Sequence, residues 1–141
     1  MAVWGALIPI CDNLEDALDR SLSYIPADSD CAAAVKLARG LVGQADGGIS
    51  IRKHYPDMSV VHTVNNLALV VWALLSHPDD FSAAIGDVVA AGLDTDCNGA
   101  TVGALWGLQD KTIPDFWSAP WGRQCGSIFS WHRHRERRGV D

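Results

Sequence analysis

The stretch "VVHTVNNLALVVWALLS", residues 60–76, is apolar around nearly its whole circumference when it is drawn as a helix. A helix on the surface of a globular protein carries one apolar stripe, whereas a helix that is apolar on every side is buried. We therefore expect a helix from about Val61 to Ser76 at the centre of the fold, with other helices packed around it.

Helical spacing of apolar residues continues on both sides of this segment. "CDNLEDALDRSLSYIP" and "ADSDCAAAVKLARGLVGQADGG" precede it, while "HPDDFSAAIGDVVAAG" and "GATVGALWGL" follow it. Proline ends the first of these helices, and Gly47 with Gly48 is expected to end the second. Three of the helices begin after residues that commonly cap helices: Asp12 or Asn13, Ser29 or Asp30, and Asp79 or Asp80. Alternation of period two is nearly absent, so the sequence predicts an all-α fold.

The composition limits the class of protein. The chain has 141 residues, of which 48% are hydrophobic and 20% charged, and this suffices for one domain with a sizeable core. No apolar stretch approaches the roughly 20 residues that cross a bilayer. The first residues lack the basic start of a signal peptide, and the four cysteines form no C-x-x-C pair. We expect a cytoplasmic chain with free thiols and no contact with a membrane.

The charge is unevenly distributed along the chain. Residues 1–120 hold 6 Lys and Arg against 15 Asp and Glu, a balance of 6 − 15 = −9, and residues 121–141 give 5 − 2 = +3. This shift predicts a helical domain over residues 1–121 and a basic, flexible tail over 122–141. An acidic body repels nucleic acid, which makes nucleic acid an improbable partner. The tail is interpreted either as a product of a shifted reading frame or as a basic binding segment.

The loop "LDTDCN", residues 93–98, raises a chemical question. Asp and Asn are good helix caps, but a single cap does not account for Asp94, Asp96 and Asn98 together. Carboxylates two residues apart in a loop can converge on one hard cation such as Mg²⁺. From the residues alone, the loop can be a helix cap, part of a metal site, or both. The glycines at 99, 103 and 107, one every four residues, predict close packing of the last helix against another.

The sequence segments around this loop resemble the C-terminal part of the ADP-ribosylglycohydrolase family. The family carries a glycine-rich D-T-D-T-N-x-A-T-x-G-A-x-x-G segment, and this chain has "DTDCNGATVGALWG" at residues 94–107. "HTVNNLALVVWALL", "YIPADSDCAAAVKLA" and "IPDFWSAP" also resemble that family, so that the resemblance spans about Ala6 to Pro120. It implies the C-terminal helices of an orthogonal all-α domain.

The resemblance also implies a chemistry. Family members hold a pair of Mg²⁺ ions and hydrolyse the bond that joins ADP-ribose to an acceptor, such as an arginine or serine side chain. Asp94 and Asp96 are then expected as metal ligands, and Cys97 stands where the family commonly has a hydroxyl ligand. Because a thiol suits Mg²⁺ poorly, Mn²⁺ is an alternative ion. An ADP-ribosylated protein or a small ADP-ribose derivative is the expected substrate.

Half of the family's metal site has no counterpart in this sequence. The family supplies its other ligands from an N-terminal T-D-D segment, whereas the Asp-Asp pair here, Asp79 and Asp80, follows a proline and reads as a helix cap. No residue is assigned as the base that activates water. We therefore expect a chain that is incomplete as an enzyme and is completed by self-association or a complementing chain. The alternative is a non-catalytic fragment or remnant.

Four further polar residues are candidates for supporting the site or contacting substrate. His62, Asn65 and Asn66 lie on the otherwise apolar central helix, and Asn98 closes the acidic loop. Buried amides need hydrogen-bond partners. The asparagines are expected either to brace the loop at residues 94–98 or to satisfy helix ends.

Overall fold

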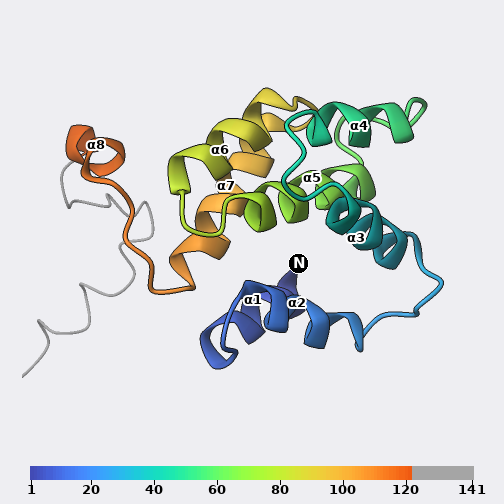
Figure 1. The fold of residues 1–141 in the computed structure, drawn as a ribbon, viewed down its shortest axis with the longest axis horizontal. Helices are drawn as coiled ribbons and strands as arrows, with labels where there is room; N and C mark the ends of the chain where they lie inside the picture. The colour runs from blue at the N-terminus through green and yellow to red at the C-terminus, as the bar shows by residue number, and fades with distance from the viewer. Residues whose placement is uncertain (122–141) are drawn as a thin grey trace, which may run out of the picture.

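The computed structural model describes residues 1–121, and all regular structure in that range is helical (Figure 1). The all-α prediction is therefore confirmed for the described residues. The predicted tail, residues 122–141, lies outside them. The helices are α1 (Ala2–Leu7), η1 (Ile8–Ile10), α2 (Leu14–Leu22), α3 (Asp30–Gly40), α4 (Gly47–His54), α5 (Thr63–Ser76), α6 (Phe81–Ala90), α7 (Thr95–Gly107), α8 (Asp115–Ser118) and η2 (Ala119–Trp121).

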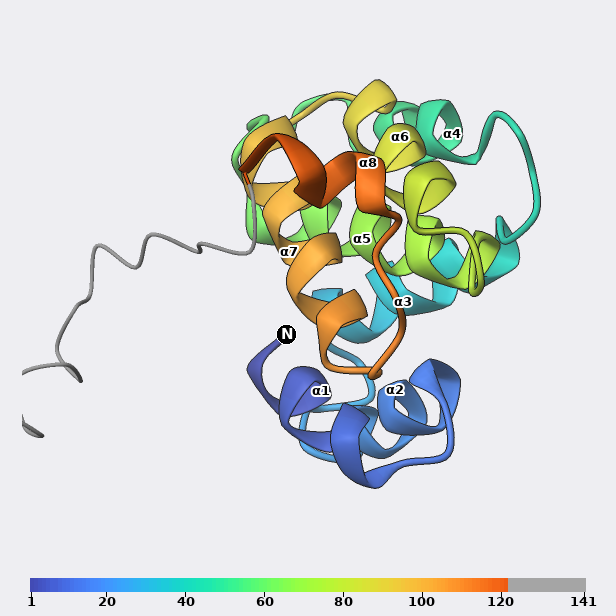
Figure 2. The same cartoon turned by 90° about the vertical axis from the view of Figure 1, so that its left-hand side faces the viewer.

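Helix α5 is the centre of the fold, as predicted. Its residues from Val64 to Leu74 are buried, with Leu67 alone partly exposed, and α3, α4, α6 and α7 pack around it (Figure 2). Burial of each large apolar side chain in this helix contributes about 1.5–3 kcal/mol. The helix begins at Thr63 rather than Val61, because His62 is its cap and accepts a hydrogen bond at Nδ1 from the backbone N–H of Val64 (3.2 Å).

The prediction that Gly47 and Gly48 end the helix after Ser29 is wrong. That helix, α3, ends at Gly40, and the two glycines instead open α4. A Cβ added at Gly47 would lie 2.2 Å from Nε1 of Trp72, so glycine permits α4 to approach α5 closely. The indole N–H of Trp72 donates to the carbonyl of Leu41 (3.1 Å), which ties the loop before α4 to the central helix.

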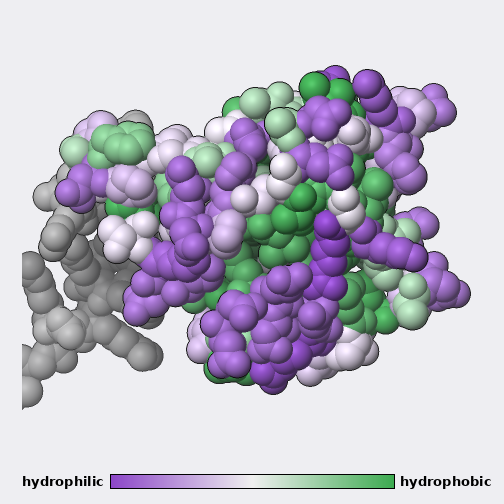
Figure 3. Space-filling model, viewed as in Figure 1, coloured by the Kyte–Doolittle hydropathy of each residue, from purple (hydrophilic) through white to green (hydrophobic). Residues whose placement is uncertain are grey.

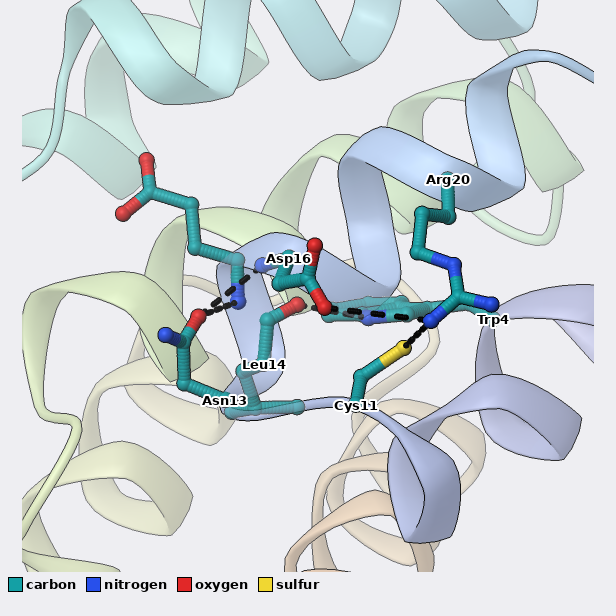
Figure 4. Close-up of polar contacts among 7 residues, drawn as sticks. Trp4, Cys11, Asn13, Leu14, Asp16 and Arg20 are labelled. Atoms are coloured by element: carbon teal, nitrogen blue, oxygen red, sulfur yellow. Dashed lines mark hydrogen bonds and ion pairs between the residues drawn. The ribbon is translucent and has the colours of Figure 1, made fainter.

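The first two helices form a hairpin that packs mainly on itself (Figure 1). Figure 4 shows its polar contacts: Trp4 Nε1 donates to the carbonyl of Leu14 (3.1 Å), and Arg20 Nη1 donates to Cys11 Sγ (3.1 Å). Asn13 caps α2 and accepts from two backbone N–H groups, as one of the two predicted caps. The short helix α1 has too few residues to show a period, and the sequence did not indicate it.

A cleft of about 510 Å³ separates this hairpin from the body of the domain. Apolar side chains of η1, α2 and α5 line it together with Arg39 and Lys111. Figure 3 shows hydrophobic residues along the line between the polar surface of α2 and the helices above it. The hairpin therefore covers the body incompletely on this face.

Helix α7 does not pack through its glycines, contrary to the sequence prediction. A Cβ at Gly99 would reach ordinary contact with Val89 (3.5 Å), but Cβ atoms at Gly103 and Gly107 would meet nothing within 4 Å. The helix packs instead through Val102, Leu105 and Trp106, which are buried against α5 and α6. Gly103 and Gly107 thus lie toward an open face.

No helix among residues 1–121 combines the length and the apolar character needed to cross a membrane.

Candidate metal centre

A tight turn between α6 and α7 presents the acidic residues. Gly92 and Leu93 both have positive φ (84° and 63°), and the second is unusual for a branched apolar residue. Such backbone strain costs on the order of 1–3 kcal/mol and collects at functional sites. Arg52 Nη1 donates to the carbonyl of Ala91 (3.3 Å) and would also lie 3.3 Å from a Cβ at Gly92. The turn is therefore held by α4 and reverses the chain directly before Asp94.

Asp94 occupies the cap position of α7, but its side chain accepts no capping hydrogen bond. Asp80 differs, because its carboxylate accepts from the backbone N–H of Ala83 (3.0 Å) at the start of α6. The expected helix start near Gly99 is corrected to Thr95, which places Asp96 and Cys97 in the first turn of α7. The Asp94 carboxylate is thus not used for capping.

The ligand atoms of Asp94, Asp96 and Cys97 converge. One oxygen from each carboxylate and the Sγ of Cys97 all lie within 4.8 Å of one another. Asp94 is partly exposed, and the other two side chains are exposed. We call these three residues the Asp–Asp–Cys cluster.

The side chains in this cluster alter one another's protonation. A hydrogen bond with the Asp94 side chain, followed by the backbone N–H groups of Asp96 and Cys97, lowers the pKa of the Asp96 carboxyl. The pKa of the Cys97 thiol is raised, first by its hydrogen bond with Asp94 and then by the negative charge of that carboxylate. Negative charge is thus concentrated where a cation could offset it.

Asn66 connects the central helix to the cluster. Its Oδ1 accepts from the backbone N–H of Asp94 (3.2 Å) and from Nδ2 of Asn98 (2.6 Å). Its Nδ2 donates to the carbonyls of Val60 (2.8 Å) and His62 (2.8 Å). Asn66 is 9% exposed and Asn98 3% exposed, so these bonds are largely shielded from water. Asn66 therefore both braces the loop and satisfies the start of α5, the two alternatives left open by the sequence.

Within residues 1–121, Asn65 and His62 make no hydrogen bond to the cluster residues themselves; Asn65 is bonded to Asn66, and His62 to the start of α5. Asn65 is fully buried, donates from Nδ2 to the carbonyl of Ser59 (3.0 Å) and accepts from Asn66 (3.1 Å). His62 caps α5 and lines a separate open cavity of about 440 Å³ with Tyr55 and Met58. Neither lines the groove beside the cluster, and their roles toward a substrate stay predictions.

A groove of about 190 Å³ lies beside the cluster. Its lining includes the cap residue Asp94, Cys97 and Asn98 of α7, and Thr63 and Asn66 of α5. The other lining residues are Met1, Val61, Leu67, Val70 and Thr101. Thr101 was not among the predicted site residues, although its spacing of four from Cys97 places both on one helix face. Its Oγ1 donates to the carbonyl of Cys97 (2.7 Å). The larger cleft beside α2 holds none of the cluster residues, so size alone does not identify the site.

The donor set fits a divalent cation only in part. Two carboxylates are the ligands that Mg²⁺ and Mn²⁺ prefer. A thiol sulfur is a soft ligand and does not fit Mg²⁺. Asp94 and Asp96 could therefore hold a hard cation without help from Cys97.

Comparison with known proteins identifies a family for the chain. No curated protein and no solved structure matched the chain. The family model for ADP-ribosylglycohydrolase matches residues 1–132, which includes every helix described above and the Asp–Asp–Cys cluster. With so much of its length matched, the chain belongs to the ADP-ribosylglycohydrolase family.

Proposed function

We propose that this chain supplies part of a metal-dependent glycohydrolase site. The reaction is hydrolysis of the glycosidic bond between ADP-ribose and an acceptor on a protein or small molecule. The observation that carries the proposal is the convergence of Asp94, Asp96 and Cys97 within 4.8 Å beside a groove. Mg²⁺ is the family's expected ion, in a pair per complete site, with Mn²⁺ as the alternative.

A divalent cation bound at such a site would orient the ribose hydroxyls and favour attack by water at the anomeric carbon. The residues of this chain contribute position and charge. Asp94 and Asp96 would hold the cation, and Asn66 fixes the backbone from which Asp94 projects. Asn98, bonded to Asn66, lines the groove.

The three cluster residues are too few to enclose two hard cations, since each Mg²⁺ takes six ligands, although water supplies several of them. The remaining ligands and the base are proposed to come from another polypeptide segment or chain. The open face of α7 supports this, because Ala100, Ala104 and Gly107 are exposed there and Gly103 has free space above it. Small residues leave room for a helix to approach the cluster.

The protein is proposed to act in the cytoplasm on ADP-ribosylated substrates. The described cysteines Cys11, Cys31 and Cys97 are free thiols, which supports a reducing compartment.

The test measures release of ADP-ribose from a protein ADP-ribosylated on arginine or serine. The chain is assayed alone and mixed with a polypeptide that carries the family's N-terminal T-D-D half, with and without divalent cations. We expect release in the mixture that depends on the cation and is abolished by Asp96→Ala. Asp28→Ala removes an exposed carboxylate outside the cluster and should leave release unchanged.

Two outcomes would contradict the proposal. Undiminished release by Asp96→Ala would remove the cluster from the reaction. No release under any condition would support the alternative, a non-catalytic remnant that keeps the helices of the fold.

A further inference from the structure

The Asp–Asp–Cys cluster combines two kinds of ligand. Carboxylate oxygens are hard and accept many divalent cations, whereas thiolate sulfur favours soft or borderline cations such as Zn²⁺ over Mg²⁺. The Cys97 side chain is exposed and stands with both carboxylates within 4.8 Å, so it is available as a third ligand. Mg²⁺ would use only two members of this set.

The ligand atoms of the cluster would have to move together by about 1 Å to form a tetrahedral zinc site. Zn–O distances of about 2.0–2.2 Å and a Zn–S distance of about 2.3 Å place ligand atoms about 3.4–3.7 Å apart around a tetrahedral ion. The present upper separation is 4.8 Å. Rotation of the exposed Asp96 and Cys97 side chains can close the difference without loss of a buried contact. Three protein ligands with a fourth position open to water is the usual arrangement in catalytic zinc sites.

The backbone of the cluster is fixed before any ion binds. Asn66 holds the N–H of Asp94, and the turn at Gly92 and Leu93 is held by Arg52. The Asp94 carboxylate gives up no capping bond on binding a cation. The entropic cost of organising the ligands is therefore confined to side-chain rotations.

We propose that the cluster is a thiophilic divalent-cation site, which binds Zn²⁺ through Cys97 Sγ and the carboxylates of Asp94 and Asp96 in preference to Mg²⁺. The inference rests on the proposed function for the location of the metal centre. Its test does not use hydrolysis, so the two can fail separately.

The experiment uses Co²⁺ as a spectroscopic probe of zinc sites. The purified full chain is titrated with Co²⁺ under reducing conditions, and thiolate-to-cobalt charge-transfer absorption is recorded in the near ultraviolet. We expect this band in the wild-type chain, its loss on addition of equimolar Zn²⁺, and its persistence in a large excess of Mg²⁺. Cys97→Ser should abolish the band and weaken Zn²⁺ binding by at least about tenfold, since even outer-shell partners are worth about 10- to 100-fold.

Matched controls separate this site from the other thiols. Cys11→Ser and Cys31→Ser each remove a described cysteine outside the cluster and should leave the band unchanged. The Cys97→Ser chain should keep the wild-type thermal midpoint, because its side chain is exposed. A band that persists in Cys97→Ser, or that disappears in Cys31→Ser, would overturn the inference. Displacement of Co²⁺ by Mg²⁺ as readily as by Zn²⁺ would overturn it too.

The two proposals fail with different experimental results. Hydrolysis with Mg²⁺ but no thiolate band would retain the proposed function and refute a thiophilic site. A Cys97-dependent band in a chain that never supports hydrolysis would retain the thiophilic site and refute the proposed function.

Discussion

Replacing Asn66 by alanine should destabilise the protein more than any exposed polar substitution. The substitution removes the acceptor for two donors, the backbone N–H of Asp94 and the Nδ2 of Asn98. It also removes the donor that serves the carbonyls of Val60 and His62. A buried polar group left without a partner costs about 1–3 kcal/mol.

The magnitude follows from the burial of the two orphaned donors. Asn98 is 3% exposed and should bear the full penalty, whereas Asp94 is partly exposed and can recover a bond with water. The free energy of unfolding should therefore fall by about 2–4 kcal/mol. With a urea m-value of about 2 kcal/mol/M, the middle of the usual range, the midpoint of denaturation moves down by about 1–2 M.

The assay is urea unfolding followed by tryptophan fluorescence, since Trp72 and Trp106 are buried. Asn13→Ala is the matched control: it removes an exposed cap and should cost about 1 kcal/mol. In the Asn66→Ala background, Asn98→Ala should lower the free energy of unfolding only a little further. The double-mutant cycle should therefore give a coupling energy of about 0.5–3 kcal/mol between the two residues. A loss for Asn66→Ala no larger than for Asn13→Ala, with additive double mutants, would refute the bracing role.

Three further predictions test other parts of the structure. Gly47→Ala should lower the free energy of unfolding by about 1–3 kcal/mol, because its Cβ would meet Trp72 at 2.2 Å. Gly103→Ala should raise the free energy of unfolding by up to about 1 kcal/mol, because its Cβ meets nothing within 4 Å and alanine favours a helix. Equal thermal shifts for the two variants would contradict this. Asp94→Ala removes first the hydrogen bond and then the negative charge that raise the Cys97 pKa, so a larger fraction of Cys97 becomes thiolate near neutral pH. Alkylation of Cys97, measured by peptide mass spectrometry with Cys31 as reference, should become faster, and an unchanged or slower rate would count against the close contact. Asp80→Ala should lower the free energy of unfolding by about 1 kcal/mol, because α6 loses its cap. Asp79→Ala should lower it by less than about 1 kcal/mol, because the ion pair with Lys111 is at the surface. A larger loss for Asp79→Ala than for Asp80→Ala in urea unfolding would contradict these roles.

Local features of the fold could be predicted from the sequence. The central helix is apolar on all sides, and this property alone requires burial. The caps at Asn13, Ser29 and Asp80 were each among the predicted pairs, because a cap depends on a residue and the next turn of chain. Asp94 and Asp96 could be singled out because one cap does not account for both.

Features that depend on partners distant in the sequence could not be predicted. Gly47 and Gly48 resemble a helix stop, and only the approach of Trp72 makes them the start of α4. Leu93 carries no sequence signal for positive φ, because leucine does not favour it. The bond from Asn98 to Asn66 spans 32 residues, so the sequence offered two roles for Asn66 and the packed structure was needed to show both.

The glycines of α7 illustrate how one pattern can have two causes. Glycine every fourth residue predicts close helix packing, but Gly103 and Gly107 meet open space within residues 1–121. These two glycines therefore leave open space on α7, and the helix is held by its larger apolar residues instead.

The central claim is that Asp94, Asp96 and Cys97 hold a divalent cation. Anomalous diffraction from crystals of the chain soaked in Mn²⁺ tests it most directly. We expect a peak among the three side chains, within about 2.0–2.6 Å of the carboxylate oxygens, that is lost in Asp96→Ala. A well-ordered cluster with no peak, or a peak that is unchanged in Asp96→Ala, would contradict it.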